Sequence, residues 1–534
     1  MKLLKPLFAF IFLIASNLVF IERVLDMVSR QRWVSLIIYL GIWGICVTSF
    51  ALTLFHENKV IQVFGGMIMA ISTAFGMSYL NIGGHFLNYM DMELLWISRG
   101  HAMKALLFYI DHLYFPVLIA LIGFISGFLP GHIEIRKKGL KLLANLMILI
   151  PFPLLAGLTF VKAGYGTVGM PQQYSAVSTF LLLQGYERVS EGMVEAKRPI
   201  RLKPTEEAWS KNILFIVDES IRHDYLDINE DKKITPFLKS IEDQLVNFGK
   251  ASSSNNCSGY SNAVLRMGGI RGKLSKIGSN PFIWSYAKEA GYTTWYLDAQ
   301  LKHGELQNFM TEEELQSIDH FVQLDKVEEA YLDQSMISEI SKILNNGKKN
   351  FIYFNKRGAH FPYTESYVTE KAPFLPQMEK GDVLGDSKEK LVNSYKNAIW
   401  WNTDEFFKIL FKIDLSESFV FYTSDHGQNL MDRGIQTHCN TEEPHHTEGM
   451  VPIFLIPNEK RKNEITKWTK TNFNKTNHFQ IFPTILFTMG YSPLEVIKEY
   501  GEGLNQRPTS PQEFSAGPVL PKFGKGVDWN TINP

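Results

Sequence analysis

Apolar residues follow different patterns in the two parts of this chain. The first 165 residues contain five apolar runs that approach or exceed about 20 residues, enough to cross a bilayer as a helix. The first run is basic at its front, but no small-residue cleavage site precedes Glu22, so we expect a retained helix rather than a signal peptide. The pattern predicts a transmembrane domain of five helices within 1–165, at residues 6–22, 35–55, 61–81, 106–129 and 140–162.

Charges beside these runs indicate how the domain is oriented. Arg136–Lys138 and Lys141 lie between the fourth and fifth runs, and basic loops of this kind stay in the cytoplasm. An odd number of spans then places the N-terminus inside and the large C-terminal part outside. The opposing signal comes from Arg23, Arg30 and Arg32, which this topology puts in an outer loop.

The rest of the chain alternates short apolar runs with helical patterns. Strands separated by helices predict a layered α/β/α domain with a largely parallel sheet over residues 208–534. The predicted strands are Asn212–Val217, Thr293–Leu297, Phe351–Phe354, Phe419–Tyr422 and Pro452–Leu455. The predicted helices are Thr235–Glu242, Lys326–Asn346 and Lys388–Lys412.

A linker over 166–207 is expected between the two domains. Tyr174–Glu187 is mildly amphipathic, and it could lie along the membrane surface or pack on the globular domain as a connector. The basic, proline-containing segment Lys197–Pro204 follows it.

Composition removes one class of partner. The 54 basic and 54 acidic residues leave no net charge, which argues against nucleic acid. Only three cysteines are present, and Cys46 lies within the second apolar run. Cys257 and Cys439 could form one disulfide in an exported domain, but the sequence cannot fix the required geometry.

Two pairs of polar residues follow predicted strands. Asp425 and His426 follow the strand that begins at Phe419, and Asp218 and Glu219 follow the first strand. Ligands bind at the carboxyl ends of strands in open α/β sheets, where an oxygen and a nitrogen ligand could hold zinc. Ordinary turn chemistry is the alternative for Asp425 and His426, and helix capping is the alternative for Glu219.

Other candidate residues stand alone in the sequence. Ser261 opens a helical pattern, where free amides and the helix dipole would stabilise a bound phosphoryl group; an ordinary capping serine is the alternative. His360 follows a predicted strand, and His438 shares a loop with His426. Solitary histidines are often structural, and the neighbouring pair His445–His446 could serve in place of His438.

These motifs together resemble one family, the membrane phosphoethanolamine transferases that modify lipid A, in the alkaline phosphatase and sulfatase superfamily. The resemblance covers nearly the whole chain in order and spacing. Besides the five apolar runs it is carried by Glu219–Arg222, Thr235–Leu238, Tyr395–Asp404, Ser424–Gly427 and Val451–Phe454. It implies an alkaline phosphatase-like C-terminal domain.

The resemblance also implies roles for particular residues. Glu219, Asp425 and His426 match the zinc ligands of the family. Ser261, four residues after Cys257, stands for the threonine that is both nucleophile and fourth ligand. The remaining matches are His360 and His438, which would bind phosphate, move protons or hold a second zinc, and the substrate-binding positions Gln300, Lys302 and Gln428, the last in place of the usual glutamate.

The implied reaction moves phosphoethanolamine from phosphatidylethanolamine to a lipid-linked glycan such as lipid A or lipopolysaccharide core, through a phosphorylated Ser261. We expect a monomer in the bacterial inner membrane with a periplasmic catalytic domain. A phosphoglycerol transferase is the main alternative, and an inactive membrane scaffold would have lost the ligand residues. Sulfatase activity is not expected, because Cys257–Ser261 lacks the x-Pro-x-Arg continuation that formylglycine formation needs.

Overall fold

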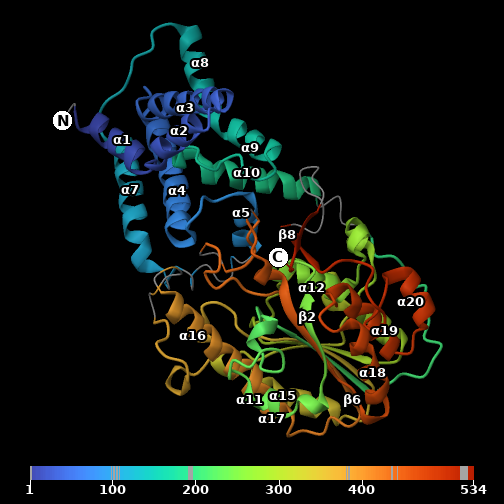
Figure 1. Cartoon of the computed structure of the whole chain (residues 1–534). Helices are drawn as coiled ribbons and strands as arrows, with labels where there is room; N and C mark the ends of the chain where they lie inside the picture. Colours follow the sequence, from blue (N-terminus) through green and yellow to red (C-terminus); the bar gives the residue numbers. More distant parts are fainter. Residues whose placement is uncertain are drawn as a thin grey trace. The chain divides into compact units, whose positions relative to one another are not determined.

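The computed structural model divides into two compact units, one extending through helix α10 (Gln172–Ser190) and one beginning ahead of strand β1 (Asn212–Asp218) (Figure 1). Each unit has its own hydrophobic core. The structure describes residues 3–533 except 98, 100–102, 104–105, 108, 191–195, 380–381, 383–384, 386, 435–436, 442 and 518–526. Part of the predicted fourth span, at residue 108, therefore lies outside the described residues.

The N-terminal unit is entirely helical where it is described. Its helices are α1 (Leu4–Ala15), α2 (Val19–Ser29), α3 (Trp33–Leu54), α4 (Lys59–Gly83), α5 (Tyr89–Ile97), α7 (Ile110–Phe128), α8 (Lys138–Leu149), α9 (Pro151–Val161) and α10 (Gln172–Ser190). Helices α3, α4 and α7 are each long and apolar enough to cross a membrane. The pairs α1–α2 and α8–α9 are bent by 53° and 42°, and they raise the number of spans to five if each pair is one span.

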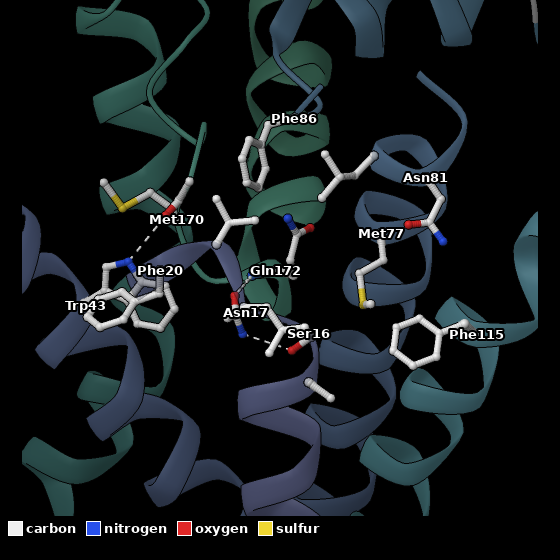
Figure 2. Close-up of a pocket in the computed structure, with 15 residues that line it drawn as sticks. Ser16, Asn17, Phe20, Trp43, Met77, Asn81, Phe86, Phe115, Met170 and Gln172 are labelled. Carbon is white, nitrogen blue, oxygen red and sulfur yellow. Dashed lines mark hydrogen bonds between the residues drawn. The ribbon is translucent and has the colours of Figure 1, made fainter. Parts of the chain in front are cut away.

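Polar side chains satisfy the backbone where α1 breaks from α2. The Ser16 hydroxyl donates to the Phe12 carbonyl at 2.6 Å, and the Asn17 amide donates to the Leu13 carbonyl at 2.7 Å. The Asn17 side-chain oxygen accepts from the Gln172 backbone at 3.0 Å beside a cavity of about 160 Å³ (Figure 2). The bend is therefore compatible with a lipid environment, in which freed carbonyls need internal partners.

Lysines gather at one end of this helical unit. Lys5 donates to the Leu129 carbonyl at 3.1 Å, and Lys59 donates to the Phe128 carbonyl at 2.8 Å, both at the C-terminus of α7. Lys141, in α8, forms an ion pair with Glu57. The starts of α1, α4 and α8 thus share one cationic end of the unit.

Helix α10 contains the amphipathic segment predicted from the sequence. The helix packs against α4 and α9, and its residues Tyr174, Ala176 and Leu183 are buried there. The amphipathic segment Tyr174–Glu187 is therefore part of the helical unit. Its apolar side chains meet other helices of the same unit.

A seven-stranded sheet forms the centre of the C-terminal unit, with strand order β2-β7-β6-β1-β5-β3-β4. Strands β1, β3, β4, β5 and β6 are mutually parallel, and β7 runs antiparallel to β6 and β2. The predicted α/β fold is confirmed, and the edge strands β2 and β4 were not predicted. The bounds are β1 (Asn212–Asp218), β2 (Val246–Ser252), β3 (Thr293–Asp298), β4 (His320–Gln323), β5 (Asn350–Asn355), β6 (Ser418–Ser424) and β7 (Met450–Ile456), with a separate pair β8 (Glu513–Ala516) and β9 (Asp528–Thr531).

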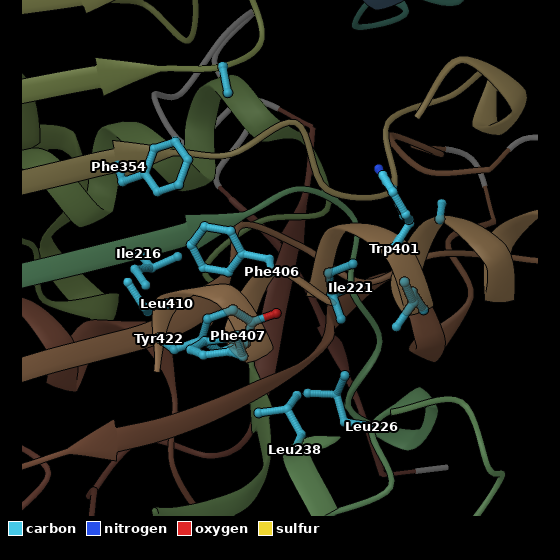
Figure 3. Packing of buried hydrophobic residues seen from close by; sticks show 14 of the residues in the cluster. Ile216, Ile221, Leu226, Leu238, Phe354, Trp401, Phe406, Phe407, Leu410 and Tyr422 are labelled. Carbon is cyan, nitrogen blue, oxygen red and sulfur yellow. The ribbon is translucent and has the colours of Figure 1, made fainter. Parts of the chain in front are cut away.

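Helices cover both faces of this sheet. Alternate residues of β1 enter different cores: Ile216 packs with Phe354, Phe406 and Tyr422 on one face (Figure 3), and Phe215 packs into the core of the other. The α-helices are α11 (Pro236–Ser240), α12 (Ser258–Met267), α13 (Ile283–Glu289), α14 (Glu312–Gln316), α15 (Leu332–Leu344), α16 (Lys388–Ile399), α17 (Phe406–Leu410), α18 (Glu459–Asn472), α19 (Ile481–Thr488) and α20 (Pro493–Tyr500). Short turns are η3 (His223–Tyr225), η4 (Glu242–Gln244), η5 (Arg271–Ser279), η6 (Glu329–Tyr331), η7 (Tyr363–Glu365), η8 (Thr369–Lys371), η9 (Trp400–Glu405), η10 (His446–Gly449) and η11 (His478–Gln480).

The helix predicted over Lys388–Lys412 is interrupted by the π-helical turn η9. The Asn402 amide donates to the Gly358 carbonyl at 2.7 Å, and the Thr403 hydroxyl donates to Asp218 at 3.1 Å. These polar side chains face the interior beneath the carboxyl ends of the strands, and the wider turn accommodates them.

Candidate metal centre

Two carboxylates and an imidazole meet at the carboxyl ends of β1 and β6. Glu219 follows β1, and Asp425 and His426 follow β6, which pairs in parallel with β1. The His426 Nε2 atom lies 3.4 Å from Glu219 Oε1 and 3.6 Å from Asp425 Oδ2. All three side chains are buried. Parallel pairing of the two strands therefore brings together residues about 200 positions apart in the sequence.

Local hydrogen bonds orient these groups toward a common point. The Asp425 Oδ1 atom accepts from the backbone amides of Ser220 at 3.0 Å and His426 at 2.7 Å. Its other oxygen, Oδ2, is buried and makes no hydrogen bond within the described part of the chain. The His426 Nδ1–H donates to the Gly427 carbonyl at 2.7 Å, so Nε2 is the nitrogen that faces the cluster. The cluster thus presents unshared oxygen and nitrogen ligands.

A second imidazole, that of His438, completes the cluster. Its ring centroid lies 4.4 Å from that of His426, and ligand atoms of Glu219, His426 and His438 lie within 4.8 Å of one another. The His438 Nδ1 atom donates to the side-chain oxygen of Gln428 at 3.1 Å. As at His426, this hydrogen bond leaves Nε2 able to bind a metal.

The electrostatics of the cluster favour a bound cation. Burial and the charge of Glu219 raise the pKa of Asp425 to about 8. Burial opposes a charged His426, yet Asp425 and Glu219 raise its pKa to about 9. Burial, reinforced by the charge of His426, lowers the pKa of His438 to about 3, so that ring is neutral. Crowded carboxylates beside neutral imidazole fit the ligand chemistry of zinc.

Ser258, which the sequence reading passed over, also lies in this cluster. It is the first residue of α12, and its hydroxyl is 3.0 Å from His426 Nε2. The same hydroxyl lies 3.3 Å and 3.4 Å from the two carboxylate oxygens of Glu219. The α12 hydroxyl at the ligand cluster is therefore that of Ser258, at the amino end of the helix.

Ser261 lies one turn further along α12 and has different surroundings. Its hydroxyl donates to the backbone carbonyl of Asp425 at 2.5 Å and lies 3.1 Å from His478 Nδ1. The side chain is fully buried. The structure thus brings Ser261 to the backbone beneath the cluster, where it contacts none of the ligand side chains through a hydrogen bond in the described residues.

Of the predicted substrate-binding residues, Gln300 reaches the cluster and Lys302 does not. The Gln300 amide donates to Glu219 Oε2 at 3.2 Å and to the Lys356 carbonyl at 2.7 Å. Lys302 donates instead to the Val327 carbonyl at 2.7 Å. Gln300 supports a ligand side chain rather than an open surface.

Gln428 and His360 also lie beside the cluster. Gln428 is fully buried and joins His438 to the hydroxyl of Tyr363. His360 follows Ala359, whose backbone amide donates to the Glu219 carbonyl at 3.0 Å. The structure therefore brings together eight of the nine predicted positions, with Lys302 outside and Ser261 at the base.

Two further features were undecided or unnoticed in the sequence. Cys257 and Cys439 form a disulfide, which settles the possibility left open above. Glu448 is a fully buried carboxylate that accepts from Asn256 at 2.8 Å. No sequence motif indicated a role for Glu448. Its position is recognisable only in the folded unit, where it contacts Asn256, Asn440 and Gly427.

Comparison with known proteins agrees with this fold and site. The sulfatase family matches residues 211–491, more than half of the chain. Kdo(2)-lipid A phosphoethanolamine 7''-transferase of Escherichia coli (strain K12) is 20% identical over 91% of this chain and 88% of its own length. The corresponding transferase of Salmonella typhimurium is 21% identical over 78% of this chain and 73% of its own.

Solved structures show the same fold. The integral membrane lipooligosaccharide phosphoethanolamine transferase A of Neisseria meningitidis matches 94% of this chain and 99% of its own, with a TM-score of 0.69 and 17% identity. The zinc complex of the C-terminal periplasmic domain of EcEptC from Escherichia coli matches 62% of this chain and 96% of its own, with a TM-score of 0.53 and 16% identity. The chain belongs to the sulfatase family, and its place in that family is among the membrane phosphoethanolamine transferases.

Proposed function

We propose that this enzyme moves phosphoethanolamine from phosphatidylethanolamine to a lipid-linked glycan such as lipid A or lipopolysaccharide core, with Ser258 as the nucleophile. The position of the Ser258 hydroxyl, 3.0 Å from His426 Nε2 and 3.3 Å from a Glu219 oxygen, carries the proposal. This assignment replaces Ser261, whose hydroxyl already donates to a backbone carbonyl.

Glu219, Asp425, His426 and His438 would hold one zinc ion beside Ser258. A bound zinc lowers the pKa of a neighbouring hydroxyl and polarises a phosphoryl oxygen. The Ser258 oxygen attacks phosphorus, the bond to the diacylglycerol oxygen breaks, and phosphoserine forms. Free amides at the start of α12 stabilise the bound phosphoryl group.

His360 is the group that we assign to proton transfer. The backbone amide of the preceding residue, Ala359, donates to the Glu219 carbonyl at 3.0 Å, and this keeps His360 near the site, where its ring would protonate the diacylglycerol oxygen as that oxygen leaves. In the second half of the reaction the acceptor oxygen attacks the phosphoserine and regenerates Ser258. A second zinc held by His360 and His438 is the alternative use of these rings.

The donor head group has a second candidate. Gln428 is neutral and fully buried, and both ends of its amide are engaged, so it offers no carboxylate to an ammonium group. This observation keeps phosphoglycerol as the alternative head group. The relatives are named for phosphoethanolamine transfer, which favours the first candidate.

The enzyme is a membrane protein, and we place it in the bacterial inner membrane with its catalytic unit in the periplasm. The cationic end formed by Lys5, Lys59 and Lys141 fits the cytoplasmic side. The Cys257–Cys439 disulfide fits an oxidising compartment. All proposed ligands come from one chain, which supports a monomer.

Intact-mass analysis of the full-length enzyme in detergent tests the proposal. After exposure to phosphatidylethanolamine vesicles we expect a phosphoethanolamine adduct on Ser258 of the native enzyme and of Ser261→Ala, but none on Ser258→Ala. A phosphoglycerol adduct from phosphatidylglycerol vesicles would establish the second candidate. An adduct that survives in Ser258→Ala would refute the assignment of the nucleophile.

A further inference from the structure

The disulfide joins two residues that are immediate neighbours of the site. Cys257 precedes Ser258 and caps α12, and Cys439 follows His438. The bond spans 182 positions of the sequence. Cys439 has a φ of +59°, a conformation that non-glycine residues rarely adopt without support from their surroundings. The disulfide thus connects the residue next to Ser258, the proposed nucleophile, with the residue next to His438.

Glu448 makes a second connection between the same two segments. Its Oε2 atom accepts from the Asn256 side-chain amide at 2.8 Å and from the Asn440 backbone amide at 3.2 Å. Asn256 and Asn440 are the outer neighbours of the two cysteines, and the Cys439 amide donates to the Asn256 carbonyl at 3.0 Å. The carboxylate therefore reinforces the disulfide from one side.

Glu448 also connects these segments to the metal-binding loop. Its backbone carbonyl accepts from the Gly427 amide at 2.8 Å, one residue after His426. Its Oε1 atom accepts from the His445 amide at 3.0 Å. One buried residue thus contacts the segments that carry Ser258, His426 and His438.

We infer that the Cys257–Cys439 disulfide and Glu448 form a positioning clamp that holds both His438 and Ser258 at the ligand cluster for phosphoryl transfer. The inference rests on the proposed function, and neither part of the clamp touches the reacting atoms. His438 lies in a segment between β6 and η10 that has no regular secondary structure where it is described. A displacement of about 1 Å in such a group can cost about 100-fold in rate.

Cysteine variants of the full-length enzyme test the covalent part. We expect Cys257→Ala and Cys439→Ala each to lower kcat about 10- to 100-fold and to weaken zinc binding about tenfold, with little change in KM. The double variant should be no worse than either single variant, because each single change already breaks the same bond. Cys46→Ala, at the one free cysteine and far from this site in the sequence, is the matched control.

Reversible reduction of the disulfide is a second test, and it uses the native enzyme, so it does not depend on whether a variant folds. Dithiothreitol becomes its cyclic disulfide as Cys257 and Cys439 become thiols, and the native enzyme should fall to the activity of the cysteine variants. Reoxidation should restore it. Cys46→Ala should stay sensitive to the reductant, and the double variant should be insensitive.

Glu448→Gln tests the other part of the clamp while the disulfide stays intact. The glutamine amide has one acceptor oxygen, so it cannot accept both from Asn256 and Asn440 at one end and from the His445 amide at the other, and kcat and zinc affinity should fall in the same direction as in the cysteine variants. Unchanged kcat and zinc affinity in the reduced enzyme and in Glu448→Gln would overturn the clamp. A native enzyme that binds zinc but transfers nothing would instead overturn the proposed function, and the zinc affinities would still decide whether the clamp exists.

Discussion

Ser258 and Ser261 occupy the same helix one turn apart, and their neighbours give them different capacities. Ser258 faces a carboxylate and an imidazole that can hold a metal beside its oxygen. Ser261 donates to a carbonyl and lies against His478 under the cluster, where its hydroxyl helps to hold the loop of Asp425 in place. The first is suited to attack phosphorus, and the second is suited to structural support.

Alanine substitution at the two serines should separate these roles. Loss of the nucleophile removes the covalent route, so Ser258→Ala should lower kcat by about 1,000-fold or more. Ser261→Ala leaves a buried acceptor with one donor fewer and should cost about 1–3 kcal/mol of stability with a much smaller change in kcat. Steady-state rates and urea midpoints of both variants measure this, and equal losses of kcat would contradict it.

His478 should make the enzyme sensitive to acid. Burial lowers the pKa of this ring to about 3, and its nitrogens lie 3.1 Å from the hydroxyls of Ser261 and Thr423. The unfolded chain takes up a proton near pH 6.5 that the folded enzyme rejects. The free energy of unfolding is therefore unaffected by the titration of His478 above pH 6.5. It decreases by about 1.4 kcal/mol per pH unit as the pH falls from 6.5 toward 3, because only the unfolded chain binds the proton.

The pH dependence of unfolding tests this contribution. In His478→Gln the titrating group is absent, so the urea midpoint should fall less between pH 6.5 and pH 4 than in the native enzyme. His303→Gln, at a ring whose side chain is 73% exposed, should keep the native dependence. Parallel curves for the native enzyme and His478→Gln would contradict the assignment.

Individual site residues differed in how far the sequence could predict them. Glu219, Asp425 and His426 directly follow strongly apolar strands, so the predicted ends of those strands were enough to identify them as site candidates. Ser258 was missed because counting four positions from Cys257 selects Ser261, whereas α12 begins directly after the cysteine. Glu448 could not be predicted, because its role depends on three chain segments that meet only in the folded unit.

At the level of elements, the turn after β5 places its backbone against the site. Gly358 has a φ of +52°, and a Cβ atom there would lie 2.2 Å from Asp218 Oδ1 and 2.7 Å from the Glu219 amide. Only a residue without a side chain fits this position. The turn thereby fixes the path of the chain on which Glu219 sits.

Gly358→Ala should consequently displace Glu219 and weaken zinc binding at least about tenfold. Gly347→Ala is a matched control, since its φ is +80° but nothing lies within 4 Å of the new Cβ. The control should lose about 1 kcal/mol of stability from left-handed strain and keep its zinc affinity. Chelator competition distinguishes the two, and native zinc affinity in Gly358→Ala would show that the turn can yield.

Elements were predictable where apolar patterns were strong. Strands β1, β5 and β6 are continuous apolar runs in the middle of the sheet. Strand β2 contains Asn247, Gly249 and Lys250 and has an irregular register with β7, so its pattern does not identify a strand. The π-helical turn η9 was unpredictable for another reason, because its inward polar side chains find their partners on distant segments.

For the whole molecule, the division into two units predicts that chemistry and membrane transfer can be separated. A relative's C-terminal periplasmic domain has been solved by itself with zinc. The C-terminal unit expressed alone should fold, bind zinc and accept a phosphoryl group on Ser258 from a soluble short-chain donor.

Its transfer to an acceptor in vesicles should nevertheless fall at least about 100-fold, because the anchored enzyme meets both lipids at a high effective concentration. Rates of the full chain and the isolated unit on soluble and vesicle substrates measure the difference. Equal rates on vesicles would mean that the helical unit contributes nothing to substrate encounter.

The disulfide beside Ser258 has a consequence for biogenesis. Under the proposed localisation, a newly made chain starts in a reducing cytoplasm and enters a membrane that already holds the proposed donor lipid. Under the clamp inference, the unbridged chain would be slow toward those lipids, and oxidation after export would activate it. Disulfide formation would then restrict activity to the side of the membrane on which we propose that the acceptor lies.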